Sequence, residues 1–137
     1  MFKHIMVPVD LGHSDRLETA LKVAADLAGH YEARVTYVGV TSAQPSAVAH
    51  NPEEYAEKLA KFTAAQGELH GLSEHSSHAI TSHDPSADLD RALEGAVSEL
   101  DADLVVMGSH IPKTFDLGSH GGRVASHTDA SVMLVRA

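Results

Sequence analysis

The chain contains no cysteine, which excludes a disulfide framework, a thiolate metal site and a cysteine nucleophile. It also contains no apolar stretch that approaches the roughly 18 residues of a membrane span. The opening residues Met1-Phe2-Lys3-His4 lead directly into a strand pattern, without the long apolar segment of a secretory signal. We therefore expect a cytoplasmic protein that does not insert into a membrane.

Basic residues are scarce, with 10 Lys and Arg against 19 Asp and Glu. This balance disfavours a broad surface for nucleic acid or anionic lipid, so we expect no nucleic-acid partner. A single free nucleotide needs only a few donors and stays compatible with the charge. The 11 histidines are scattered along the chain. His75, His78 and His83 lack zinc-type spacing, so we expect no metal site there.

Motifs for catalysis are missing as well. The chain has neither a G-x-S-x-G nucleophile turn nor a G-x-x-x-x-G-K-[ST] phosphate loop. We therefore assign no catalytic residue and expect slow hydrolysis at most.

Strand and helix patterns alternate along a single domain, residues 1–137. Strands are expected at residues 4–9, 34–40, 78–82, 104–107 and 132–135. Helices are expected from Ser14 to Gly29, from Asn51 to Gly71, from the turn at residues 83–86 to Leu100 and over Ser119–His127. This order predicts a doubly wound, Rossmann-like α/β fold with a five-stranded parallel sheet and helices on both faces.

The segment from Asp103 to the C-terminus is the most informative. An apolar strand ends at Gly108, and a second glycine, Gly118, is followed by Ser119 where a short helix is expected to begin. Helix starts bind phosphate because their first N–H groups lack intrahelical partners and lie at the positive end of the peptide dipoles. Since ligands of such sheets bind beyond the carboxyl ends of the strands, we expect a crevice there.

These features together resemble the universal stress protein family, in its small single-domain bacterial form. The resemblance rests on the opening MFKHIMVPVD, the strands VTYVGV and DADLVVMGSH, the Gly118-Ser119 pair and the terminal SVMLVR. It implies strand order 3-2-1-4-5 and homodimers paired through the last strand. It also implies an ATP motif of glycine, two residues, glycine, nine residues, glycine, and Ser or Thr.

Carried onto this chain, the resemblance implies a nucleotide site. Val9 and Val38 would approach the adenine through their backbones, and Asp10 would face the ribose or, through Mg²⁺, the phosphates. The implied site residues are Pro8, Val9, Asp10, Val38, Met107, Gly108, Gly118, Ser119, His120 and Gly121. His110 and His120 flank the loop and could donate to phosphate, and Lys113 could add a positive charge.

The loop departs from the family motif. Its second glycine is replaced by Ile111, Pro112 follows, and six residues rather than nine separate Ile111 from Gly118. Pro112 has no N–H and restricts Ile111 to extended conformations. We therefore expect a weaker grip on the phosphates than on the adenosine, with ATP or AMP as the ligand.

Three functions remain open at this point. The first is a homodimeric regulatory protein that binds an adenine nucleotide and modulates a stress response or a transporter. The second is a dimeric interaction module with weak or no nucleotide binding. The third, an adenylate-using hydrolase or transferase, lacks the loop motifs that such chemistry requires.

Overall fold

A computed structural model describes residues 1–109 and 120–136 of the chain. Its strands are β1 (His4–Pro8), β2 (Arg34–Ser42), β3 (His75–Ser82), β4 (Leu104–Ser109) and β5 (Ser131–Arg136). Its helices are the short 3₁₀-helix η1 (Leu11–Leu17) and α1 (Glu18–Tyr31), α2 (Pro52–His70), α3 (Pro85–Leu100) and α4 (His120–His127).

The sheet has five strands in the order β3-β2-β1-β4-β5, and every pairing is parallel. This confirms the expected doubly wound fold. β2 and then β3 lie on one side of β1, and β4 and then β5 lie on its other side. The direction of winding therefore reverses between β1 and β4, next to the end of the first strand.

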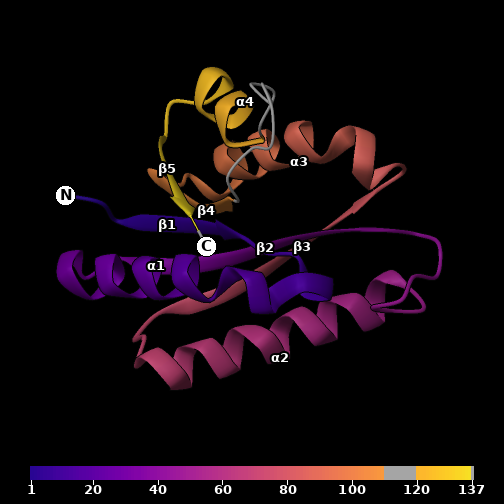
Figure 1. Ribbon diagram of the computed structural model, residues 1–137, viewed down its shortest axis with the longest axis horizontal. Coiled ribbons are helices and arrows are strands. Elements are labelled where there is room, and N and C mark those ends of the chain that lie inside the picture. The colour runs from indigo at the N-terminus through magenta and orange to yellow at the C-terminus, as the bar shows by residue number, and fades with distance from the viewer. Residues whose placement is uncertain (110–119, 137) are drawn as a thin grey trace.

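Helices cover both faces of the sheet, with α1 and α2 on one face and α3 and α4 on the other (Figure 1). The central strand shows why both faces are apolar. Ile5 and Val7 point into the core beneath α1 and α2, and Met6 points into the core beneath α3 and α4. Successive side chains of a strand alternate between faces, so a strand buried on both sides is a continuous apolar run.

The caps of α2 and α3 follow from local chemistry. The Asn51 side chain accepts a hydrogen bond from the Glu54 N–H at 2.7 Å, and α2 ends at Gly71, whose φ of +65° lies in the left-handed region. Asp84 caps α3 in the same way through the Ala87 N–H. These boundaries agree with the sequence expectation.

The boundaries expected for the first helix were wrong. Ser14 lies inside η1, which is capped by Asp10, and Gly29 lies inside α1 rather than at its end. The helix continues to Tyr31 and stops where Glu32 takes a φ of +56°. Tertiary packing of α1 on the sheet overrides the modest helix penalty of one glycine.

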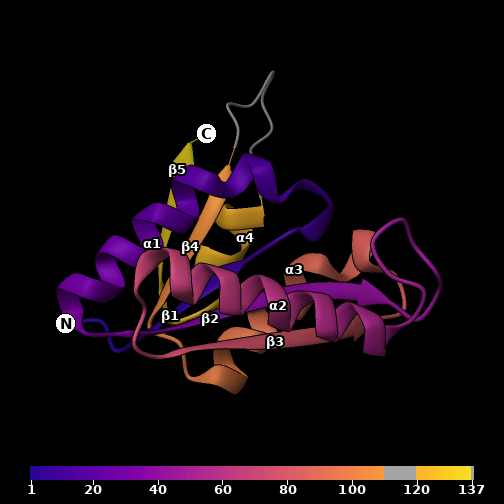
Figure 2. The same cartoon turned by 90° about the horizontal axis from the view of Figure 1, so that it is seen from below.

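Two strands are longer than their sequence patterns indicated. β2 continues to Ser42, and β3 begins at His75, because the two strands pair residue by residue from Val35–His75 to Ser42–Ser82 (Figure 2). Val38 therefore lies within β2, four residues before its end. Among the described residues, no helix combines the length and the apolar character needed to cross a bilayer.

Candidate functional site

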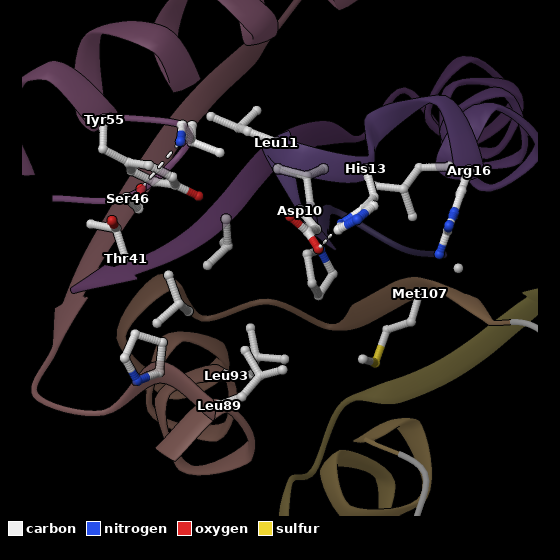
Figure 3. Close-up of a pocket in the computed structure, with 18 of the residues that line it drawn as sticks. Asp10, Leu11, His13, Arg16, Thr41, Ser46, Tyr55, Leu89, Leu93 and Met107 are labelled. Atoms are coloured by element: carbon white, nitrogen blue, oxygen red, sulfur yellow. Dashed lines mark hydrogen bonds and ion pairs between the residues drawn. The ribbon is translucent and has the colours of Figure 1, made fainter. Parts of the chain in front are cut away.

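A cavity of about 610 Å³ opens at the carboxyl edge of the sheet, where the winding reverses (Figure 3). It is bordered by the ends of β1, β2 and β4, by η1, by the segment after β2, and by the first turns of α2 and α3. Its lining residues are Pro8, Val9, Asp10, Leu11, His13, Arg16, Leu17, Val38, Val40, Thr41, Ser42, Ser46, Val48, Tyr55, Pro85, Leu89, Leu93, Met107, Gly108 and Ser109.

The two ends of the cavity differ in chemistry. Tyr55, Thr41 and Ser46 lie toward one end, and Leu89 and Leu93 of α3 form an apolar wall below it (Figure 3). At the other end, His13 and Arg16 of η1 lie on the side of Met107, near the end of β4 (Figure 3). A flat apolar group with hydroxyl neighbours fits the first end, and an anionic group fits the second.

The Tyr55 ring occupies the space that a side chain at position 39 would need. A Cβ at Gly39 would collide with the Tyr55 hydroxyl and would lie 2.9 Å from Cζ of the ring. The glycine thus lets the ring pack flat against β2, where only 5% of Tyr55 is exposed. Burial, and after it the charge of Asp10, raises the pKa of Tyr55 to about 12, so the phenol stays neutral near pH 7.

Asp10 lines the cavity and also caps the helix η1. Its carboxylate accepts the Gly12 N–H at 3.0 Å and lies 3.0 Å from Nδ1 of His13. The first of these bonds caps η1. Asp10 therefore faces the cavity with a charge that is already partly compensated by the turn that follows it.

Gly108 is required for a reason that the sequence did not indicate. A Cβ there would lie 2.7 Å from Cδ2 of Leu17 and 3.6 Å from Cβ of Ala20. The space above Gly108 is thus taken by the end of η1 and the start of α1. Gly108 lines the cavity, but its missing side chain makes room for another part of the chain.

The structure brings together six of the predicted site residues. Pro8, Val9, Asp10, Val38, Met107 and Gly108 all line the cavity. The Val38 carbonyl accepts the Val9 N–H at 2.8 Å, so this acceptor is already partly used. The predicted contacts of these six residues with a nucleotide stay predictions.

The other predicted residues lie at or beyond the limits of the description. His110, Lys113, Gly118 and Ser119 lie outside the described residues. His120 and Gly121 open α4, and their roles stay predictions. In the parts of the chain that are described, no group of three or more His, Cys, Asp or Glu could hold a metal ion.

Sequence reasoning missed several lining residues. Tyr55, Leu89 and Leu93 lie within the expected helices but were not assigned to the site, and neither was Arg16. A signal was nevertheless present, because Asp10, His13 and Arg16 recur every three residues directly after the first strand. That spacing matches the three residues per turn of a 3₁₀-helix.

The fold and the cavity define a class: an open, parallel α/β domain with a ligand-sized crevice at its topological switch point. The sequence model of the universal stress protein family matches residues 1–136. The chain therefore belongs to the universal stress protein family. The comparison with curated proteins gives no match.

Solved structures support the same fold. A universal stress protein in complex with cAMP superposes with a TM-score of 0.75 at 20% identity, covering 98% of this chain and 97% of that one. The Archaeoglobus fulgidus universal stress protein in complex with dAMP gives 0.67 at 22% identity, with 96% of each chain covered. An Arabidopsis thaliana family protein with AMP bound gives 0.65 at 16%, covering 98% of this chain and 90% of that one.

Proposed function

We propose that this protein binds an adenine nucleotide in the cavity between β1, β2 and β4 and acts as a regulatory protein. The observation that carries the proposal is the cavity's position at the strand-order reversal, the place where open α/β sheets bind their ligands. Its volume of about 610 Å³ falls within the usual range for small-molecule sites.

Different parts of the cavity lining suit the base, the ribose and the phosphate of a nucleotide. The apolar wall of Leu89 and Leu93 and the neutral Tyr55 suit the base, and Asp10 suits the ribose hydroxyls. The basic end at η1 suits phosphate. Mg²⁺ would enter only with the nucleotide, held by Asp10 and the phosphates, because the described lining offers one carboxylate.

Ligands of three structural neighbours favour this class. The neighbours were crystallised with cAMP, dAMP and AMP. All three ligands consist of an adenine, a sugar and one phosphate. The proposal for this chain is therefore adenine-nucleotide binding, with ATP as one of the ligands to be compared.

Calorimetric titration of AMP, cAMP and ATP, with and without Mg²⁺, tests the proposal directly. GMP serves as the matched control for the base. We expect saturable binding of at least one adenine ligand, tighter than GMP, together with a raised melting temperature. Native mass spectrometry of the freshly purified protein would reveal a carried nucleotide. An absence of binding at millimolar adenine nucleotide contradicts the proposal.

A dimeric interaction module is the second candidate, and the free edge of β5 favours it. Met133 and Leu134 of this edge strand are 39% and 40% exposed, which makes them two of the most exposed large apolar side chains in the described chain. An apolar edge strand offers both backbone pairing and apolar area to a second copy. We propose that the homodimer forms through β5, as the family resemblance implies.

Light scattering after size exclusion tests the dimer. A Leu134→Glu variant should shift the protein toward monomer, and Leu69→Glu, at an exposed site on α2 with 73% exposure, should not. A dimer that survives Leu134→Glu and Met133→Glu contradicts pairing through β5. If the monomeric variant also lost nucleotide binding, the nucleotide site would depend on the dimer.

A further inference from the structure

The charges around the cavity are few and unevenly placed. Among its described lining residues, Asp10 is the one acidic side chain, and His13 and Arg16 are the basic ones. All three belong to the connection between β1 and α1. Within the described lining, the charged side chains therefore come from one short segment.

Two of these groups are already engaged with each other. Nδ1 of His13 lies 3.0 Å from the Asp10 carboxylate, and the Gly12 N–H donates to the same carboxylate. For the Arg16 guanidinium, by contrast, no hydrogen bond or ion pair with any residue of 1–109 or 120–136 is present. Arg16 thus brings to the wall of the cavity a positive charge that is paired with no described residue.

Packing explains why this charge lies at the β4 end. Leu17, the neighbour of Arg16, fills the space above Gly108, where a Cβ would lie 2.7 Å from Leu17 Cδ2. This contact fixes the last turn of η1 directly against the end of β4. Arg16 accordingly lies beside Met107, at the end of the cavity opposite Tyr55 (Figure 3).

Solvent exposure gives the bland alternative, since Arg16 is an exposed residue and arginines commonly extend into water. Its position among the lining residues and the absence of a local carboxylate partner argue against that alternative. Asp15 and Glu18 are close in sequence, yet neither pairs with Arg16 in the described structure. A guanidinium that has no partner among residues 1–109 and 120–136 and that lies beside a cavity is suited to an anion from outside.

We propose that Arg16 binds the phosphate group of the adenine nucleotide, so that this chain recognises a nucleotide over a nucleoside through a side chain of η1. The inference rests on the proposed function and identifies which residue reads the charged part of the ligand. A planar guanidinium presents paired N–H donors that match two phosphate oxygens, and it stays charged at any physiological pH. Phosphate recognition then depends on a side chain that the first strand and Gly108 position.

The test compares AMP with adenosine, because the two ligands differ only in the phosphate. In the unaltered protein, we expect AMP to bind more tightly than adenosine, and added salt to weaken AMP alone. Arg16→Gln should weaken AMP about tenfold, as expected for loss of a charge-assisted hydrogen bond. It should leave adenosine affinity unchanged. Arg16→Lys should retain part of the AMP affinity, since it keeps the charge but not the paired donors.

Arg91→Gln is the matched control. Arg91 is an exposed arginine on α3 outside the cavity lining, so this variant makes the same change in net charge without touching the site. We expect its AMP and adenosine affinities to equal those of the unaltered protein. Circular dichroism and the melting temperature check that each variant is folded.

The outcomes separate the inference from the function on which it rests. If Arg16→Gln leaves the ratio of AMP to adenosine affinity unchanged while both ligands bind, the inference is wrong and the proposed function stands. If Arg16→Gln and Arg91→Gln weaken AMP equally, net charge rather than contact is responsible, and the inference is also wrong. If the unaltered protein binds neither ligand, both fail.

Discussion

The two ends of the same sheet use polar side chains in opposite ways. At the amino end, polar groups form hydrogen bonds with one another. At the carboxyl end, Asp10, His13, Arg16 and Tyr55 border a cavity of about 610 Å³. The amino end holds the chain together, and the carboxyl end is where we propose that a ligand binds.

The amino end is a closed network around His4. Its Nδ1 bonds the Leu100 carbonyl at 2.9 Å and its Nε2 bonds the Thr36 hydroxyl at 2.6 Å. Thr36 in turn bonds Ser76 at 2.9 Å, so the network crosses three neighbouring strands. Buried polar groups are stabilising when every member is satisfied, and here His4 has both ring nitrogens engaged.

The carboxyl end lacks this closure. The strands there end at different points, with β2 running on to Ser42 while β1 stops at Pro8. This stagger leaves room above β1, and the helices that start there frame it rather than fill it. Polar groups with spare bonding capacity are costly to bury without a partner, so they are retained where solvent or a ligand can reach them. The comparison yields four predictions.

A large effect that is confined to stability is expected at the amino end, from Asp103→Ala. The Asp103 carboxylate accepts the Lys3 N–H at 2.8 Å and the His4 N–H at 3.1 Å, which anchors the first strand. Loss of both charged hydrogen bonds should lower the free energy of unfolding by about 2 kcal/mol in urea titration. AMP affinity should not change. Asp15→Ala, at an exposed position, is the control. If Asp103→Ala kept normal stability but bound AMP more weakly, the amino end would serve binding rather than stability, and the comparison would be wrong.

Gly39→Ala should affect both stability and binding. The added Cβ collides with the Tyr55 hydroxyl, and the ring must move either into the cavity or out of its packing. Overpacking of this kind costs about 1–3 kcal/mol, and the moved ring should weaken adenosine binding. Gly29→Ala is the control, because nothing lies within 4 Å of a Cβ there and alanine favours the helix. Unchanged adenosine affinity in Gly39→Ala would indicate that Tyr55 does not contact the ligand.

The free energy of unfolding should depend on pH because of His4, which lies in the hydrogen-bond network at the amino end. Burial, and after it the charge of Arg34, holds the pKa of His4 below its usual value of 6.5. The unfolded chain therefore takes up this proton first, so stability is present above pH 6.5 and declines as the pH falls below it, by at most about 1.4 kcal/mol per pH unit.

Urea titrations above and below pH 6.5 measure this slope. His4→Gln should flatten it, and His83→Gln, at an exposed histidine, should not. An equal slope in all three proteins would assign the acid sensitivity to other groups.

Tyr55→Phe should give the smallest effect and confine it to the open end. The variant keeps the ring packed on Gly39 and removes only the neutral hydroxyl beside the cavity. We expect adenosine affinity to fall by a factor of about 3–10, typical of one hydrogen bond, with little change in the urea midpoint. Tyr31→Phe, at a tyrosine outside the cavity lining, is the control. A large loss of stability instead would assign the hydroxyl to the core.

Much of the fold was predictable because its signals are local. The apolar run from Ile5 to Val7 and the caps at Asn51 and Gly71 each act within a few residues, and the structure agrees with them. The early part of β3 was missed because His75, Ser76 and Ser77 have no strand pattern of their own. They become extended because β2 offers hydrogen-bonding partners.

Part of the cavity lining was predictable for the same reason. Pro8, Val9, Asp10, Met107 and Gly108 lie at or next to the ends of their strands, and parallel strands bring their carboxyl ends to one edge. Tyr55 and Arg16 could not be found by such a rule. Tyr55 reaches the cavity because Gly39 of another element lacks a side chain, and Arg16 reaches it because its neighbour Leu17 packs over Gly108.

The order of amino acids alone determined which segments form strands and helices, the doubly wound class and the edge at which a ligand is expected. Hydrophobic alternation, capping and chain direction are properties of neighbouring residues. Tertiary structure decided which side chains border the cavity, which polar groups are satisfied within the fold and which cavity side chain, Arg16, has no partner among the described residues. Those outcomes depend on contacts between residues far apart in the chain, such as His4 with Leu100 and Leu17 with Gly108, and such contacts exist only after the layers have packed.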